Sequence, residues 1–195
     1  MKTTEIEILK NGQQFFKQYF INHKVVYLYI KDGQLKHFVV SMSKANFMHL
    51  CGVSYKHGPK SFYDGLKRNQ LKLNLITFKE DGTSRQKISA LSMIEELINT
   101  NVRVCEQGRY LHLSFDRALR SNKNLVALTL ISKQAQFLPN SLLNLKSSKP
   151  IGFPISYEVV HVFKVSNITK EKQIVLPCKD EYLKKVDSYL FGITI

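Results

Sequence analysis

The chain has 195 residues, 44% of them hydrophobic, and carries 29 Lys and Arg against 15 Asp and Glu, a formal net charge of +14. This length fits one domain that can bury a core without disulfides, and three cysteines without a CxxC spacing give no disulfide framework. The positive charge attracts polyanions, of which nucleic acid is the commonest. No apolar run is long enough for a membrane span, and the N-terminus lacks the apolar stretch of a signal peptide. A cytoplasmic protein without membrane contact is therefore expected.

The first half of the chain predicts mainly helices and one hairpin. Apolar residues at helical spacing indicate a helix over 5–21. Strands near 25–31 and 35–41 should pair antiparallel, because Asp32-Gly33 between apolar runs is a strong hairpin signal. Four further elements follow in order: a helix over 44–52 that Ser43 caps and Gly52 ends, a short helix over 61–69, a strand over 71–78 and a long helix over 85–101.

The second half predicts mainly strands, because it is rich in β-branched and aromatic residues that alternate with polar ones. The expected strands cover 102–107, 109–115, 125–132, 155–165 and 174–177, and a helix is expected over 180–190. Residues 115–124 are interpreted as a basic helical turn or loop, and residues 137–154, rich in Ser, Asn, Lys and Pro, as a loop. The predicted fold class is α+β, with N-terminal helices packed on a mostly antiparallel β-sheet.

Motifs for several kinds of chemistry are absent from the sequence. It has no glycine-rich phosphate loop, no Cys/His spacing of a structural zinc site and no GxSxG elbow. The acidic residues are few and scattered, which argues against a two-magnesium nuclease, and Cys51 is interpreted as a small core residue. No metal and no cofactor are expected. The histidines, cations and hydroxyls suit metal-independent RNA cleavage, in which the 2′-hydroxyl attacks the phosphate with the help of a base, an acid and cations.

One histidine stands in an otherwise apolar segment, Phe47-Met48-His49-Leu50-Cys51-Gly52-Val53. Two interpretations of His49 are open. As a structural residue, its ring bonds a backbone carbonyl and caps the short helix, since polar groups among apolar residues find such partners. As a functional residue, it transfers protons or orients RNA.

Further candidates for contact with RNA are cationic, aromatic and imidazole side chains in a basic loop, at a helix start and on probable strands. They are Lys56, His57, Lys60, Tyr63, Arg85, Lys87, Arg109, Tyr110 and His112. Alternation along 109–115 would place Tyr110 and His112 on one face of a strand, which suits an RNA cleft. Solvated surface is the alternative interpretation of most of these positions.

The order of these segments resembles a small nuclease family of phages and conjugative elements, the fourth phage subgroup of the barnase/EndoU/colicin/RelE-like ribonuclease superfamily. Its pattern is an aromatic residue before His-Leu-x-Gly, a Phe-Tyr pair further on and a late Pro-x-Ser element. The matching residues are Phe47, His49, Leu50, Gly52, Phe62, Tyr63, Pro154, Ile155 and Ser156. The resemblance covers roughly residues 5–165.

The resemblance implies helices packed on an antiparallel sheet, as in barnase and RelE, and RNA cleavage without a metal. It also implies that His49 and Ser156 are catalytic and lie, with a set of Lys and Arg, near the cleaved phosphate. Residues 1–166 would then form the nuclease-like domain, and residues 167–195 a C-terminal extension packed on the same domain.

Two functions are consistent with these observations. The first is a metal-independent endoribonuclease of a mobile genetic element, acting on RNA as a toxin or in phage–host conflict, with a protein inhibitor as a further partner. The second is a non-catalytic basic protein that binds nucleic acid or a nucleoprotein defence complex as an inhibitor, in the manner of an anti-CRISPR protein. A DNA-binding regulator is a weaker alternative, since no helix-turn-helix pattern supports it. Catalysis requires a proton-transfer group and cations that converge on one phosphate position, whereas binding requires only the charged surface.

Overall fold

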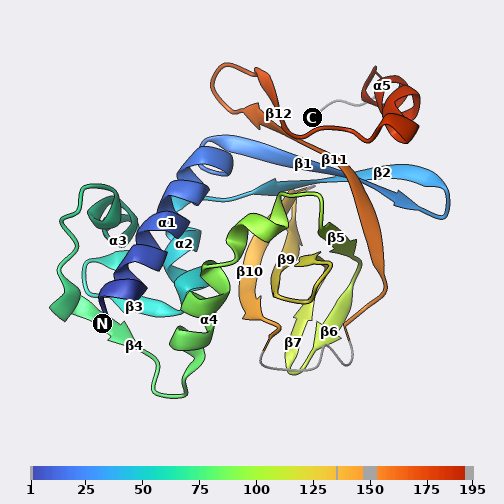
Figure 1. The fold of residues 1–195 in the computed structure, drawn as a ribbon. Helices are drawn as coiled ribbons and strands as arrows, with labels where there is room; N and C mark the ends of the chain where they lie inside the picture. The colour runs from blue at the N-terminus through green and yellow to red at the C-terminus, as the bar shows by residue number, and fades with distance from the viewer. Residues whose placement is uncertain (1, 135, 147–152, 192–195) are drawn as a thin grey trace.

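Seven strands close into a mixed β-barrel in the computed structural model, which describes residues 2–134, 136–146 and 153–191 (Figure 1). Their order around the barrel is β1 (His23–Lys31), β2 (Gln34–Ser41), β10 (Gln136–Asn144), β9 (Val126–Lys133), β8 (Arg117–Ser121), β5 (Val102–Cys105) and β11 (Ser156–Ser166). β11 also pairs with β1, which closes the ring. Neighbouring strands run antiparallel, except that β10 and β2 run parallel where Phe137 meets Val40.

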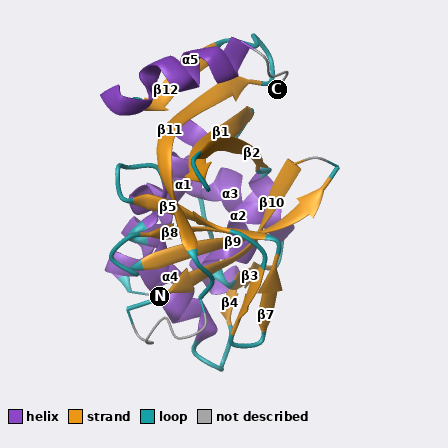
Figure 2. Ribbon diagram, turned by 90° about the vertical axis from the view of Figure 1, so that its right-hand side faces the viewer, coloured by secondary structure: helices purple, strands orange, loops and turns teal. Residues whose placement is uncertain are grey.

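The remaining elements surround this barrel. On one side of the barrel lie the helices α1 (Thr3–Tyr19), α2 (Lys44–Cys51), α3 (Gly58–Lys67) and α4 (Thr83–Leu91), with the 3₁₀ turns η1 (Leu73–Leu75) and η2 (Ile94–Leu97) (Figure 1). Of these helices, α2 and α4 lie next to β10. Two small pairs are β3 (Val53–Tyr55) with β4 (Ile76–Phe78), and β6 (Gly108–Tyr110) with β7 (Leu113–Phe115). β12 (Lys172–Leu176) pairs with the outer side of β11, and η3 (Asp180–Tyr182) leads into α5 (Leu183–Phe191). Figure 2 shows β12 and α5 together, apart from the other helices.

The prediction of helices packed on an antiparallel sheet is wrong, although the content is α+β. β1 shows the physical reason, because four consecutive residues, Val25 to Leu28, are fully buried and both faces of the strand are covered. Val25 and Tyr27 join the core beneath the helices, whereas Val26 and Leu28 join a second cluster with Val186 of α5. Alternation in a sequence indicates strands, but closure depends on whether distant strands meet, and closure removes exposed edges.

The main core lies between α1–α4 and the barrel and is rich in aromatic residues. The ring centroids of Phe16 and Phe47 are 5.0 Å apart, and those of Tyr27 and Phe38 are 5.3 Å apart. The Tyr27 hydroxyl donates a hydrogen bond of 3.2 Å to the carbonyl of Leu97 in η2. The predicted helix over 85–101 therefore ends at Leu91, because the chain turns there and carries the apolar residues of η2 onto the barrel strands.

Three other local predictions are wrong in ways that matter for the site. Residues 117–121, expected in a turn or loop, form β8 between two partner strands. Residues 136–144, expected mainly in a loop, form β10, where a bulge between Pro139 and Ser141 accommodates a proline that cannot donate to the ladder. The rest of that expected loop includes 147–152, which lie outside the described residues. The strand expected over 109–115 is the hairpin of β6 and β7, turned by Leu111 at a φ of 54°.

Other predictions are confirmed. The hairpin of β1 and β2 turns at Asp32 and Gly33, α2 begins after Ser43 and ends at Gly52, and β11 covers the strand expected over 155–165. None of the helices in the described parts of the chain is long and apolar enough to cross a membrane.

Two histidines lie beneath the C-terminal layer of β12 and α5. His37 Nδ1 is 2.9 Å from the hydroxyl of Tyr189 in α5. His161 is 5% exposed, and its Nδ1 is buried without a hydrogen-bond partner. Burial lowers the pKa of both rings, so each favours the neutral form in the folded chain.

Replacement of His161 by glutamine should make the stability less sensitive to acid. Burial holds the pKa of His161 below its ordinary value of 6.5, so the unfolded chain takes up this proton first. The free energy of unfolding therefore falls as the pH drops below about 6.5 towards the folded-state value. Urea unfolding from about pH 8 to pH 5 would measure this loss, with exposed His112→Gln as the control. If wild type and His161→Gln lost stability equally on acidification, the lowered pKa of His161 would not be a cause of the acid sensitivity.

Candidate functional site

A cleft of about 560 Å³ opens between α2, α4, the β6–β7 hairpin and β10. Its polar lining includes His49, Lys79, Lys87, Tyr110, Asn140 and Asn144. These residues come from four separate parts of the chain, so only the tertiary fold brings them together. Imidazole, ammonium, phenol and amide groups around one cavity make this cleft the first candidate for a functional site.

His49 is exposed at the mouth of this cleft, although its neighbours Phe47 and Leu50 are buried in the core. The helical spacing of α2 turns the imidazole outward while the apolar residues face inward. Its Nε2 lies 2.8 Å from the backbone carbonyl oxygen of Asn140. Because a carbonyl oxygen only accepts, Nε2 carries the hydrogen and Nδ1 keeps its lone pair in the neutral ring.

The bulge in β10 presents this carbonyl. Asn140 lies between Pro139 and Ser141, where the pairing with β9 shifts register, so its carbonyl is free to accept from another element. The Asn140 side-chain amide donates a hydrogen bond of 3.2 Å to the carbonyl of Ser114 in β7. One residue thus connects the histidine of α2 to the hairpin on the opposite wall of the cleft.

The end of α2 is locked against α4. Gly52 adopts a left-handed φ of 70°, and its N–H donates to the His49 carbonyl at 3.0 Å. Lys87 Nζ donates to the same carbonyl at 3.3 Å, and the Ser84 hydroxyl donates to the Gly52 carbonyl at 2.5 Å. A Cβ atom at Gly52 would lie 2.8 Å from Lys87 Cδ and 3.2 Å from Ser84 Cα. The glycine of the His-Leu-x-Gly pattern is therefore required by both conformation and space.

The cleft is positively charged. Lys79 is exposed and Lys87 is 8% exposed, and neither belongs to an ion pair within the described residues. Burial lowers the pKa of Lys87, and the charge of Lys79 lowers it further. Burial also raises the pKa of the Cys51 thiol, which stays protonated in the core and is no nucleophile. An anion such as a phosphate would relieve the repulsion between the two ammonium groups.

The cleft contains some of the predicted site residues. His49, Lys87 and Tyr110 line it, and Tyr110 does so as a largely buried side chain packed 5.0 Å from the ring of Phe153. Arg85 is exposed and lines a neighbouring cavity that shares Lys79.

Other predicted residues lie elsewhere. Lys56, His57 and Lys60 are exposed around the start of α3, outside the lining of the cleft. Tyr63 is 1% exposed and packs in the core, so its ring has no free face for a base. Arg109 and His112 are exposed on the hairpin, and His112 lies in its turn, so it shares no strand face with Tyr110.

The structure does not bring Ser156 to His49. Ser156 begins β11, and in the closed barrel three strands (β9, β8, β5) on one side and two (β2, β1) on the other lie between β11 and β10, whose Asn140 carbonyl holds His49. The hydroxyl of Ser156 instead accepts hydrogen bonds from Arg103 Nε at 2.9 Å and Arg120 Nη2 at 2.7 Å. The expectation that one phosphate meets both residues has no support in this geometry.

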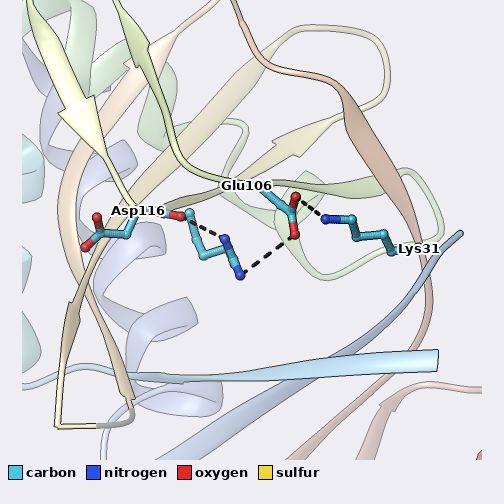
Figure 3. Close-up of polar contacts among 4 residues, drawn as sticks. Lys31, Glu106 and Asp116 are labelled. Atoms are coloured by element: carbon cyan, nitrogen blue, oxygen red, sulfur yellow. Dashed lines mark hydrogen bonds and ion pairs between the residues drawn. The ribbon is translucent and has the colours of Figure 1, made fainter. Parts of the chain in front are cut away.

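A third polar cluster joins three barrel strands. Lys31 Nζ of β1 lies 2.6 Å from Glu106 Oε2, and Arg117 Nη2 of β8 lies 3.9 Å from Glu106 Oε1, as the dashed contacts of Figure 3 show. The hydrogen bond from Lys31 lowers the pKa of the Glu106 carboxyl, so it stays ionised between its two cations. Arg117 Nη1 also donates a hydrogen bond of 3.1 Å to the carbonyl of Asp116. Paired charges of this kind fix strands β1 and β8 to the end of β5.

Sequence reasoning missed Lys79, Asn140 and the pairing of Arg103 with Arg120. Lys79 precedes a turn and Asn140 lies in a segment interpreted as a loop, so neither belonged to a recognisable pattern. Within the described ranges, no cluster of three or more His, Cys, Asp or Glu residues is arranged to hold a metal ion.

The cleft, with its exposed imidazole and uncompensated cations, has the features of a protein that acts on phosphate-containing polymers. The chain belongs to the family described as phage-Barnase-EndoU-ColicinE5/D-RelE like nuclease4, whose match covers residues 8–184. This confirms the resemblance noted in the sequence and extends it beyond residue 165, through β12 and into α5. The chain is therefore a member of a nuclease family, with nucleic acid as the substrate class. No curated protein and no solved structure matches it.

Substitution of Gly52 by alanine should destabilise the protein more than substitution of Gly33 by alanine. Both glycines have φ near 70°, at 70° and 73°, but a Cβ at Gly33 meets nothing within 4 Å. Gly33→Ala should cost about 1 kcal/mol for the strained backbone alone, and Gly52→Ala about 2–4 kcal/mol because Lys87 and Ser84 must move. Urea unfolding of the two variants tests this, and equal losses would show that the α2–α4 junction is not tightly packed.

Proposed function

We propose that this protein is a metal-independent endoribonuclease whose reaction takes place in the His49 cleft. The observation that carries the proposal is the exposed imidazole at the mouth of a cleft that also holds Lys79 and Lys87. A buried ring remote from every cation would have argued against it. The net charge of +14 supports a polyanionic substrate, and the nuclease family supports nucleic acid.

His49 is suited to the proton transfers of RNA cleavage. Because Nε2 is held by the Asn140 carbonyl, Nδ1 is the nitrogen left to accept the proton of a ribose 2′-hydroxyl. The 2′-oxygen then forms a bond to the adjacent phosphorus, and the bond from phosphorus to the 5′-oxygen breaks. The 5′-oxygen takes up a proton as it leaves, and the same imidazole can return the one it removed. The products are a 2′,3′-cyclic phosphate and a 5′-hydroxyl.

The lysines supply the electrostatic part of the mechanism. Negative charge builds up on the phosphate oxygens when the 2′-oxygen adds, and fixed cations in a cleft stabilise it. Lys87 is held by the carbonyl of His49 itself, so the base and a cation are fixed relative to each other. This chemistry uses the ribose 2′-hydroxyl as its nucleophile, which is why RNA and not DNA is the proposed substrate.

The proposal includes a biological setting, which the phage-nuclease family supports. A phage-type nuclease that attacks RNA in the cytoplasm would serve as a toxin or as an effector in conflict between mobile elements and their hosts. A chain of this kind requires a protein inhibitor or a restricted target if the producing cell is to survive. A protein inhibitor and a specific RNA target are therefore both part of the proposal.

Removal of the imidazole should abolish most of the cleavage. In His49→Ala, cleavage of labelled single-stranded RNA with EDTA present should fall by about 10²–10⁴-fold, the usual contribution of a general acid–base group. Wild type should leave single-stranded DNA of the same sequence intact, because it lacks the attacking hydroxyl. His57→Ala is the matched control, since His57 is also exposed but lies outside the cleft.

Two outcomes would contradict the proposal. Equal cleavage by wild type and His49→Ala would place the reaction elsewhere, and loss of cleavage on addition of EDTA would show that a metal is needed. If neither substrate is cut while RNA is bound in a salt-sensitive manner, the protein is the non-catalytic binder instead.

A further inference from the structure

Arg103 and Arg120 form a compact cationic group on barrel strands β5 and β8, outside the lining of the His49 cleft. They are directly opposite each other on the antiparallel strands β5 and β8. Both guanidinium groups converge on Ser156: Arg103 Nε and Arg120 Nη2 donate to its hydroxyl at 2.9 and 2.7 Å, and Arg103 Nη2 donates to its carbonyl at 2.8 Å. Like charges directly opposite in a sheet are unfavourable unless something compensates them.

The described residues provide no such compensation. Neither arginine belongs to an ion pair there. Glu158, the residue opposite Arg103 on β11, is paired with Lys179. Burial raises the pKa of the nearby Cys105 thiol, which therefore contributes no negative charge. By contrast Arg117, three residues before Arg120 on the same strand, is paired with Glu106.

The hydroxyl of Ser156 has one donor left. A hydroxyl has two acceptor lone pairs and one O–H, and both lone pairs receive hydrogen bonds from guanidinium groups. Its O–H donates to no partner among the described residues. The site therefore offers two positive charges, their remaining N–H groups and one O–H, all of which are donors. An oxyanion, which only accepts, complements such a set.

We propose that Arg103, Arg120 and Ser156 bind a phosphate of the RNA strand that is cleaved in the His49 cleft. This assignment rests on the proposed ribonuclease function. Ser156 is then a phosphate-binding residue and not a catalytic one, and the contact fixes the position of the strand without reading its sequence.

The β6–β7 hairpin connects this oxyanion site to the cleft. Its residues Tyr110 and Phe115 pack in one apolar cluster with Cys105 and Ala118, which are two positions along their strands from Arg103 and Arg120. Tyr110 also lines the cleft that holds His49. An RNA strand that crosses this hairpin, where Arg109 is exposed, passes from one site to the other.

Binding of uncut RNA tests the oxyanion site separately from cleavage. The double variant Arg103→Gln/Arg120→Gln is prepared in the His49→Ala background, and its affinity for a single-stranded RNA is measured by fluorescence anisotropy over a range of KCl concentrations. Affinity should fall about 10- to 100-fold, as expected for loss of charge-assisted hydrogen bonds. The slope of log K against log salt should become less steep by about 0.7, the value for one phosphate of a single strand.

Arg117→Gln in the same background is the matched control for Arg120→Gln alone, because each removes one charge from β8 and only Arg117 is paired with a carboxylate. It should leave the salt slope unchanged, and a loss equal to that of Arg120→Gln would overturn the proposal. Arg120→Lys keeps the charge and should give a smaller loss than Arg120→Gln, since an ammonium lacks the planar fork. This single substitution keeps the test valid if the double variant does not fold.

A free phosphate is the other source of the same chemistry. Inorganic phosphate at millimolar concentration should raise the melting temperature of wild type more than that of the double variant, because the same donors bind any oxyanion, and the RNA affinity of the double variant then decides between the two sources. A selective rise in wild type, with unchanged RNA affinity in the double variant, would assign the site to a small phosphate and overturn the strand contact. If wild type binds RNA through these arginines but does not cut it, the nuclease proposal fails while the RNA-binding site stands. If cleavage is normal and the double variant binds as wild type does, only the oxyanion site fails.

Discussion

The antiparallel pairing of β1 with β11 is the contact on which the rest of the molecule depends. It joins strands that are more than a hundred residues apart in the chain and turns a twisted sheet into a closed barrel. Both faces of β1 are then buried, one by the main core beneath the helices and one by a second cluster with residues of η3 and α5. Closure also leaves the outer edge of β11 to β12, so the C-terminal segment becomes part of the fold. The family match through residue 184 agrees with this continuity.

Two irregularities in regular elements create the His49 cleft. A bulge in β10 frees the Asn140 carbonyl for the imidazole, and a left-handed glycine ends α2 where α4 packs closest. Each departs from the lowest-energy local geometry, and each is stabilised by contacts from other elements. His49 has a structural contact through Nε2, which anchors the ring to the barrel, and in the proposed reaction Nδ1 takes the proton of the substrate. The two interpretations of this residue describe different nitrogens of one side chain.

The arginines of this protein differ in whether a carboxylate compensates their charge. On β8, Arg117 is neutralised by Glu106, which is also bound by Lys31, so these groups fix barrel strands together. Arg120 on the same strand has a second arginine opposite it and no carboxylate within the described residues. A cation that is paired with a carboxylate stabilises the fold, whereas an unpaired cation can bind a substrate, and the net charge does not distinguish the two. The net charge of +14 therefore overstates the number of functional cations.

The sequence by itself determined much of the local structure. The Asp32-Gly33 hairpin, the Ser43 and Gly52 limits of α2 and the strand of β11 follow from turn chemistry and apolar periodicity, which act over a few residues. It also made His49 a candidate site residue, because one imidazole stands in an otherwise apolar segment.

Tertiary structure decided the rest. A segment interpreted as a loop, which contains Pro139, forms β10 because β9 and β2 lie beside it. The predicted long helix ends at Leu91, because the residues of η2 pack on the barrel strands. Closure of the sheet, the separation of Ser156 from His49 and the convergence of Arg103 and Arg120 all depend on contacts between residues far apart in the chain. Local pattern cannot specify them, because strand neighbours are chosen by the packing of the whole core and not by the strands themselves.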